Sequence, residues 1–309
     1  MPRGIQLKKQ TTAQFTLSEA LDAFTRHNAV KNLSHRTIRN YEQIIHNFMK
    51  WCPENKISKV TIETVEFYIM YLQNQNISQQ YITSKVRNLR TFLYFCMERE
   101  YMSTFNIPLP KADEVIKEPY TEAELEKLMR KPITTNFVEL RCWAMSNFFL
   151  GTGCRISTAL SIKLYNIDFE NRIIKLEKLK NRRQQYIPLS SKLSSILKDY
   201  LSYWDSSQDD YLFPNGYSGE QVALRSAQQA LAAYNHSKGV TKTGSHRYRH
   251  TYAKLYIMNG GGAFQLQRLL GHSTLDMTRK YVNLYATDLQ EGYDVLNPLD
   301  TLNKRIGKR

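Results

Sequence analysis

The sequence has no apolar run of about 18 residues, the length that a membrane-spanning helix needs. Its opening stretch, MPRGIQLKKQ, lacks the apolar core of a signal peptide. The 309 residues include only four cysteines, which lie far apart and form no CxxC pair. This spacing argues against a zinc site and against a disulfide framework. We therefore expect a cytoplasmic protein without a membrane partner.

Nucleotide-binding patterns are missing as well, since the chain contains neither GxGxxG nor GxxxxGK followed by Ser or Thr. Acidic residues are scarce: 28 Asp and Glu stand against 43 Lys and Arg, for a formal net charge of +15. The surplus is +6 in residues 1–117 and +9 in residues 118–309, so it is not a detachable basic tail. Nucleic acid held between two basic domains fits this distribution, and an anionic membrane surface is the rival interpretation.

The length corresponds to about two domains, and a proline-containing stretch divides it. Residues 106–119 hold three prolines and no helical period, which predicts a linker. Before it, residues 17–105 carry four amphipathic helical patterns, each preceded by a capping residue. These caps are Thr16, Ser34, Thr61 and Ser78. We expect residues 1–16 to be a flexible lead and residues 17–105 to form a small helical domain.

Residues 120–285 predict a second domain of mixed α/β structure, followed by a C-terminal tail over 286–309. The predicted elements are a capped helix after Thr121, an apolar helix over 136–150, a β-hairpin with strands 172–177 and 184–189, and helices over 190–204, 221–236 and 246–259. The fold class is therefore mainly α with a small β-sheet.

Basic residues gather at two places outside the apolar patterns. In the helical domain they are Arg36, Arg39, Lys85, Arg87 and Arg90; in the turn of the hairpin they are Lys178, Lys180, Arg182 and Arg183. Each group is either an ordinary solvated surface or a surface that contacts DNA phosphates without reading the sequence. For the turn alone, the solvated loop is the simpler interpretation.

The second domain also contains a spaced set of residues suited to one chemistry. Arg155 follows two glycines at the end of the apolar helix, and the segment His246-Arg-Tyr-Arg249-His250 precedes Leu-Gly-His272, with Tyr281 nine residues later. An arginine within the histidine pair repels cations, so we exclude a metal site. Two arginines, two histidines, a lysine and a tyrosine suit the cleavage of a phosphodiester. The tyrosine ester formed in that reaction conserves the energy of the broken bond, so no ATP is needed. No cofactor is expected.

The order Arg155, Lys180, His246-x-x-Arg249, Leu-Gly-His272 and Tyr281 resembles the tyrosine site-specific recombinases, also called the phage integrase family. It is most similar to Xer-like recombinases and simple mobile-element integrases, and the resemblance covers residues 17–285. It implies a helical core-binding domain followed by the family's catalytic domain. It also implies double-stranded DNA core sites as substrate, a homotetramer on that DNA, strand exchange through a Holliday junction, and a possible accessory directionality factor.

The resemblance assigns a role to each matching residue. Arg155 and Arg249 would clamp the scissile phosphate, His246 would assist proton transfer, His272 would donate a hydrogen bond to the phosphate, Lys180 would be the general acid, and Tyr281 would form a 3′-phosphotyrosine. Lys178 lies on the same turn as Lys180 and stays open as the acid. The tail over 286–309 would dock on a neighbouring subunit or pack on its own domain.

Other residues depart from the family pattern or compete with it. Thr158 stands at a position where the family commonly has an acidic residue that braces the site. We expect this difference to change the support around the catalytic residues but not to abolish the reaction. Tyr285 is a second candidate nucleophile, but its spacing from His272 is wrong by four residues. His250 is interpreted as structural. Residues 1–16 are too few for an arm-binding domain, so we expect binding to core sites alone.

Several functions share these features. Within the family, integration or transposition of a mobile element stands beside Xer-type resolution of chromosome or plasmid dimers. A type IB topoisomerase-like enzyme would use the same chemistry without site dependence. A non-catalytic, sequence-specific DNA-binding protein would explain the charge, but it would have no need of Tyr281.

Neutralising Arg36 or Arg87 tests whether the basic helical surface serves affinity and not chemistry. We expect weaker DNA binding and a salt dependence of log K that is flatter by about one unit per lost phosphate contact. Equilibrium binding over a range of salt concentrations measures both quantities. A slower cleavage rate at saturating DNA would contradict this division of roles.

Overall fold

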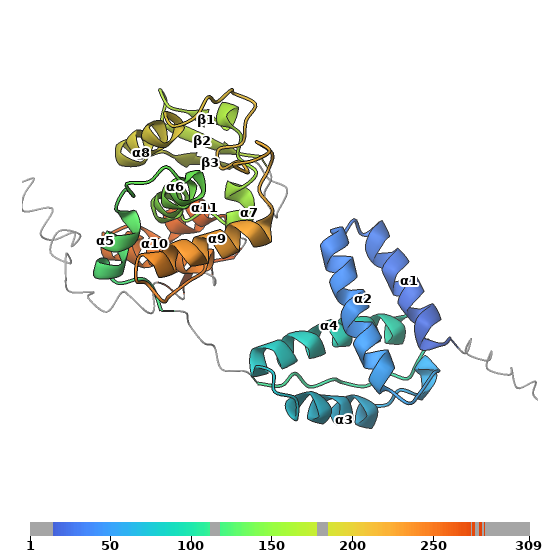
Figure 1. Cartoon of the computed structure of the whole chain (residues 1–309). Coiled ribbons are helices and arrows are strands. Elements are labelled where there is room, and N and C mark those ends of the chain that lie inside the picture. The colour runs from blue at the N-terminus through green and yellow to red at the C-terminus, as the bar shows by residue number, and fades with distance from the viewer. Residues whose placement is uncertain are drawn as a thin grey trace, which may run out of the picture. The chain divides into compact units, whose positions relative to one another are not determined.

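The computed structural model describes residues 15–111, 118–177, 185–272, 274–275, 278–279 and 281. The chain divides into two compact units, Met1–Ile116 and Lys117–Arg309, each of which is described by itself (Figure 1). The division falls inside the stretch 106–119, which the prolines predict as a linker.

The described part of the first unit forms four α-helices and one 3-10 turn. They are α1 (Leu17–Val30), α2 (His35–Trp51), η1 (Ile57–Lys59), α3 (Ile62–Gln73) and α4 (Gln79–Glu98). Each α-helix begins directly after its predicted cap, whose side-chain oxygen accepts a hydrogen bond from a backbone N–H of the first turn. Thr16 and Glu19 form a reciprocal capping box. The four predicted caps are thus confirmed.

Aromatic side chains from all four helices form the core of this unit. Phe24, Phe48, Tyr68 and Phe92 are fully buried, and α4 packs against α1, α2 and α3. The rings of Phe24 and Phe92 meet edge to face with centroids 5.5 Å apart. Burial of each ring stabilises the unit by about 1.5–3 kcal/mol, so the apolar stripes of the sequence account for the bundle.

The beginning of the predicted linker packs on α4. Ile107 is buried, Tyr94 donates a hydrogen bond to the Asn106 side chain at 3.0 Å, and Thr83 donates one to the Pro110 carbonyl at 3.0 Å. The prolines prevent a helix here, but hydrogen bonds to α4 hold the extended chain in place. Residues 106–111 therefore belong structurally to the helical unit.

The described part of the second unit surrounds one buried helix with further helices and a small sheet. Its elements are α5 (Glu122–Met129), α6 (Phe137–Thr152), α7 (Ile156–Ala159), η2 (Leu164–Asn166), β1 (Ile167–Asp168), β2 (Ile173–Leu176), β3 (Gln185–Pro188), α8 (Ser191–Leu201), α9 (Leu224–Ser237), α10 (Ser245–Met258) and α11 (Ala263–Leu270). The strands are antiparallel in the order β1-β2-β3, with Ile174 paired to both Ile167 and Ile187.

The mixed α/β prediction is confirmed, with differences at the element ends. The helix predicted over 190–204 ends at Leu201, and the one predicted from 221 begins at Leu224. Strand β1 and helix α11 were not predicted, because β1 has only two residues and α11, unlike the equally short α5, begins after a glycine with no side-chain cap.

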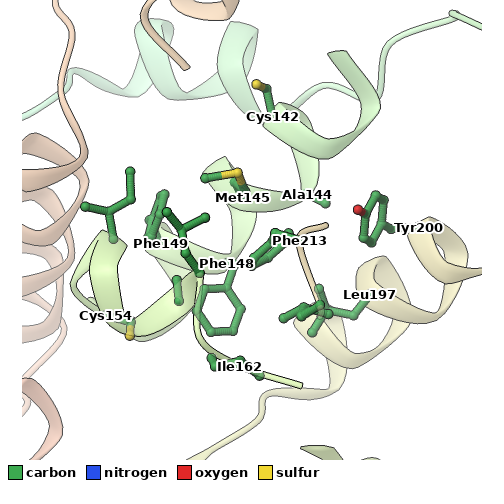
Figure 2. Close-up of a cluster of buried hydrophobic side chains, with 14 of the residues drawn as sticks. Cys142, Ala144, Met145, Phe148, Phe149, Cys154, Ile162, Leu197, Tyr200 and Phe213 are labelled. Atoms are coloured by element: carbon green, nitrogen blue, oxygen red, sulfur yellow. The ribbon is translucent and has the colours of Figure 1, made fainter. Parts of the chain in front are cut away.

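Helix α6 forms the centre of the second unit, and it is apolar around nearly its whole circumference. Met145, Phe148 and Phe149 are buried among side chains of neighbouring elements, including Tyr200 of α8 and Phe213 (Figure 2). Helices α5, α8, α9 and α10 pack against it. A helix that is apolar on all sides is stable only when covered in this way, as the apolar run of the sequence predicts.

A buried chain of hydrogen bonds fixes α10 against α6 and α9. The hydroxyls of Ser146 and Tyr248 lie 2.9 Å apart, Tyr248 donates to the Asn235 side chain at 3.2 Å, and the Asn235 amide donates to the Tyr120 hydroxyl at 2.8 Å. Because buried polar groups are costly when unpaired, this chain specifies a single position for α10. The position matters because α10 carries several of the candidate site residues.

Two further observations concern membrane-spanning helices and cysteine-based or metal sites, which the sequence argues against. No helix in the described ranges is long and apolar enough to cross a bilayer. The four cysteines are buried free thiols, and the described residues contain no group of three or more His, Cys, Asp and Glu side chains placed to hold a metal ion.

Replacing Gly153 by Ala tests how strongly the end of α6 is constrained. Gly153 has φ 63°, and an added Cβ would lie 2.5 Å from Tyr252 and 2.6 Å from Leu270. We expect the free energy of unfolding to fall by more than about 2 kcal/mol, since backbone strain and overpacking both act. Urea denaturation followed by tryptophan fluorescence measures the loss.

Gly219→Ala is the matched control, because Gly219 has φ 70° but nothing within 4 Å of the added Cβ. It should show the strain alone, about 1–2 kcal/mol. Equal losses in the two variants would contradict the packing constraint at Gly153.

Candidate active site

The C-terminal end of α6 delivers Arg155 to the site. Gly153 caps the helix in the left-handed conformation, and its N–H donates to the Phe149 carbonyl at 2.9 Å. The chain then turns, and Arg155 becomes the N-cap of α7, where its side chain is half-buried. The two glycines before Arg155 thus let a side chain leave a helix that is otherwise wholly in the core.

Arg249 connects two helix ends across the second unit. Its side chain is only 5% exposed, and its two terminal nitrogens donate to the Gly153 carbonyl at 2.9 Å and the Leu270 carbonyl at 2.7 Å. Those carbonyls lie at the C-terminal ends of α6 and α11, where helical backbone oxygens lack partners. The guanidinium therefore satisfies both helix ends and holds them beside α10.

The two arginines repel each other electrostatically. Burial and the neighbouring Arg155 lower the pKa of Arg249 to about 10, so the side chain still carries its charge at neutral pH. Within the described ranges, no ion pair joins either arginine to a carboxylate. Thr158, at the position where the family commonly has an acid, is a buried neutral side chain. Two clustered cations without a described countercharge favour the binding of an anion.

His272 and Tyr281 lie next to this positive charge. His272 is 9% exposed, and its Nδ1 lies 2.9 Å from the Thr278 hydroxyl. Burial, together with the charges of Arg249 and Arg155, lowers the pKa of His272 to about 4, so its imidazole is neutral at pH 7. The rings of His272 and Tyr281 are nearly parallel, with centroids 6.5 Å apart.

The hydroxyl of Tyr281 contacts a residue to which the sequence analysis gives only a structural role. Its Oη lies 2.9 Å from Nδ1 of His250, with the ring centroids 5.5 Å apart. The structural role expected for His250 is therefore incomplete, because this imidazole contacts the candidate nucleophile. The sequence does contain one indication of such a contact, because His250 follows Arg249 directly in the segment of the chain that is densest in histidine. Only the fold shows that residue 281 approaches it.

His246 lies on the first turn of α10 with an exposed side chain. It precedes Arg249 by three residues and His250 by four, so all three lie toward one side of the helix. Of the six residues proposed for catalysis, the structure thus places Arg155, Arg249, His272 and Tyr281 in one neighbourhood and His246 one helical turn away.

The basic turn of the hairpin, with Lys178, Lys180, Arg182 and Arg183, lies outside the described residues, as does Tyr285. The strand that follows the turn is nevertheless tied to the site. Gln185, the first residue of β3, donates to the carbonyls of Arg268 and Leu269 at the end of α11. These bonds place the start of β3 beside the helix end that Arg249 holds.

The basic residues of the first unit lie at or near its surface. Arg36, Arg39 and Arg87 are exposed. Lys85 and Arg90 are half-buried on α4, where they lie over the exposed rings of Tyr81 and Tyr94 at 4.7 Å and 5.7 Å from the ring centroids. An accessible surface of cations and aromatic rings suits contact with a phosphate backbone.

The arrangement in the second unit is equipped to bind an anionic ester and attack it. The arginines supply positive charge at positions that are buried or half-buried from solvent. His272 is a neutral hydrogen-bonding group, and Tyr281 places its hydroxyl beside His250. Charge fixed before the reaction stabilises the negative charge that grows on phosphoryl oxygens. The described site contains all the groups needed for nucleophilic attack at phosphorus except the acid for the leaving oxygen.

Comparison with known proteins gives two family matches. Residues 119–288 match the phage integrase family, and residues 20–102 match the N-terminal SAM-like domain of phage integrases. Among curated proteins, tyrosine recombinase XerC of Oceanobacillus iheyensis is 27% identical over 289 residues, which cover 89% of this chain and 94% of that protein.

Solved structures share the fold at low sequence identity. The Tn1549 transposon integrase in complex with a circular intermediate DNA has a TM-score of 0.72 and 19% identity, covering 86% of this chain and 94% of that chain. The XerH site-specific recombinase bound to its difH substrate has a TM-score of 0.67 and 19% identity, covering 91% and 85%.

The depressed pKa of His272 predicts a specific loss of stability in acid. Below its ordinary pKa of 6.5, the imidazole is protonated in the unfolded chain but stays neutral in the fold until about pH 4. The free energy of unfolding should therefore decrease as the pH falls through this window, by up to about 3 kcal/mol from this residue. Denaturation curves between pH 7 and pH 4 measure the effect.

His272→Asn is the control, because it keeps a polar group near the position of Nδ1 but does not titrate. Its stability should fall less steeply over the same window, and parallel curves for the two proteins would contradict the assignment.

Proposed function

Because the chain belongs to the phage integrase family of tyrosine recombinases, we propose that it cleaves and rejoins duplex DNA at specific sites through Tyr281. The observation that carries this assignment is the pair of arginines beside a tyrosine hydroxyl, with no carboxylate paired to either in the described structure. A scissile phosphodiester supplies the negative charge that this arrangement lacks.

Arg155 and Arg249 bind the non-bridging oxygens of the phosphate. Arg249 already donates to two carbonyls, but a guanidinium has five N–H groups, so donors remain for the phosphate. Bidentate contacts orient the phosphorus, and the positive charge becomes more stabilising as the pentacovalent transition state gains negative charge. The arginines thus supply the charge stabilisation that a metal ion provides in other phosphoryl-transfer sites.

Tyr281 attacks the phosphorus and forms a 3′-phosphotyrosine, while the 5′-oxygen leaves. Lys180 donates the proton to that oxygen, with Lys178 as the alternative acid. His272 donates a hydrogen bond to a phosphate oxygen, and His246 assists proton transfer. The ester keeps the energy of the broken bond, so rejoining needs no ATP.

The DNA contacts extend beyond the scissile phosphate. We propose that Arg36, Arg39, Lys85, Arg87 and Arg90 of the first unit, together with Lys178, Arg182 and Arg183 of the hairpin turn, hold the backbone of a core site. Four copies of the chain would assemble on two such sites, exchange strands through a Holliday junction in the cytoplasm, and accept an accessory directionality factor.

The biological role has two candidates. We propose integration or transposition of a mobile element, supported by the fold shared with the Tn1549 integrase and by Thr158 in place of the usual acid. Xer-type dimer resolution is the alternative, favoured by the match to XerC over 89% of the chain. Sequencing the DNA that becomes covalently attached to the protein in cells distinguishes them, since element ends and a chromosomal resolution site differ.

Tyr281→Phe tests the chemistry. A nicked core-site duplex traps the covalent adduct, because the short 5′-strand diffuses away after cleavage. We expect the variant to bind this DNA normally but to form adduct at least about 10³-fold more slowly, since the attacking oxygen is gone. Denaturing gels measure the adduct, and gel-shift assays measure binding.

Tyr285→Phe is the matched control and should form adduct at the wild-type rate. Adduct formation by Tyr281→Phe would overturn the nucleophile assignment. Relaxation of a supercoiled plasmid that carries no core site would instead indicate a topoisomerase-like function.

A further inference from the structure

His250 contacts the atom that attacks the DNA. Its Nδ1 lies 2.9 Å from Oη of Tyr281, and the two ring planes are inclined by 50°. We propose that His250 is a catalytic residue that accepts the phenolic proton of Tyr281 during cleavage and returns it during rejoining. This inference rests on the proposed function, because it requires Tyr281 to be the nucleophile.

A proton acceptor is needed because a phenol is a poor nucleophile at neutral pH. With an ordinary pKa of about 10, only about 0.1% of a tyrosine is ionised at pH 7. A general base removes the proton as the new bond forms, and an imidazole is the side chain whose proton affinity suits this pH. The contact geometry of His250 lies within the hydrogen-bond range that such a transfer requires.

His250 lies among charged and titratable side chains. The charged and titratable groups in this part of the fold are Arg249 and His246 on α10, Arg155 before α7, His272 after α11, and Tyr281. Arg249, Arg155 and His250 all act to lower the pKa of His272, which places these side chains in one electrostatic neighbourhood.

Acceptance of the proton requires one direction of this hydrogen bond. With Nδ1 unprotonated, the Tyr281 hydroxyl donates to it, and the oxygen lone pairs stay available for attack. His272 is engaged differently, since its Nδ1 lies against the Thr278 hydroxyl at 2.9 Å. His250 thus contacts the nucleophile, whereas His272 is the residue proposed to hydrogen-bond the phosphate.

The step balances in both directions. In cleavage, the bond from Oη to phosphorus forms, the bond from phosphorus to the 5′-oxygen breaks, the phenolic proton moves to Nδ1 of His250, and the 5′-oxygen takes a proton from the general acid. In rejoining, the 5′-hydroxyl returns its proton to the general acid as it attacks the phosphorus, the bond from phosphorus to Oη breaks, and His250 returns its proton to Oη. No oxidant, metal or nucleotide takes part.

The test separates proton acceptance from simple positioning. His250→Asn keeps a hydrogen-bonding group near the position of Nδ1 but has no basicity. Single-turnover cleavage is measured from pH 5.5 to pH 9.5 at saturating concentrations of a nicked duplex that carries the core site recovered by covalent trapping. A second duplex has sulfur in place of the bridging 5′-oxygen, so its leaving group needs no acid.

We expect the wild-type rate to rise with pH and level off in the range where imidazoles titrate. The Asn variant should cleave about 10²–10³-fold more slowly at pH 7, and its rate should keep rising about tenfold per pH unit toward the ionisation of the phenol. The sulfur duplex should restore a Lys180→Ala variant but not the His250 variant. His236→Asn, at an exposed histidine near the end of α9, should match wild type.

Two outcomes overturn the inference. Cleavage by His250→Asn at the wild-type rate shows that the imidazole is dispensable. A slower rate with an unchanged pH profile assigns His250 to positioning alone. Both results leave the proposed function standing provided that Tyr281→Phe forms no adduct, whereas an adduct from Tyr281→Phe removes the proposed function itself.

A measurement without a change at residue 250 covers the case in which the variant fails to fold. Replacement of Tyr281 by 3-fluorotyrosine makes the phenol more acidic. If His250 is the base, the pH at which the rate levels off stays where it was. A shift of that pH by the full change in phenol acidity would mean that the tyrosine ionises without a base, which contradicts the proposal.

Discussion

The second unit depends on one buried guanidinium that satisfies the ends of two helices. Arg249 donates to the carbonyls of Gly153 and Leu270, which close α6 and α11. Without this donor, both helix ends would leave backbone oxygens unpaired next to the core, which costs about 1–3 kcal/mol for each group. The same bonds place Arg155, which follows Gly153, and His272, which follows Leu270 by two residues, on either side of Arg249.

This arrangement gives the site a positive charge that the protein itself does not balance in the described ranges. A carboxylate at residue 158 would offset part of it, but Thr158 is neutral. Burial, together with the charge of Arg155, lowers the pKa of Arg249, and burial together with both arginine charges lowers the pKa of His272. In the proposed function, the bound DNA phosphate offsets the repulsion between the two arginines.

The basic residues divide by burial. Arg249 lies in the core, whereas Arg36, Arg39 and Arg87 lie at the surface of the helical unit, where each charge is hydrated and screened by salt. Lys85 and Arg90 are intermediate, since each lies over a tyrosine ring of α4. In the proposed function, the surface cations serve affinity for DNA and the buried arginine serves the chemistry.

The sequence by itself determined the helices of the first unit, the buried helix α6, the hairpin strands and the candidates Arg155, His246, Arg249, His272 and Tyr281. These follow from local causes, namely caps, apolar periods and residue order, which are visible within a few positions. The contact between His250 and Tyr281, the packing of Ile107 on α4 and the two carbonyl bonds of Arg249 were decided only by the tertiary structure. Each joins residues between 13 and 96 positions apart. No local pattern encodes such a distance, because it results from how the helices pack around α6 and α4.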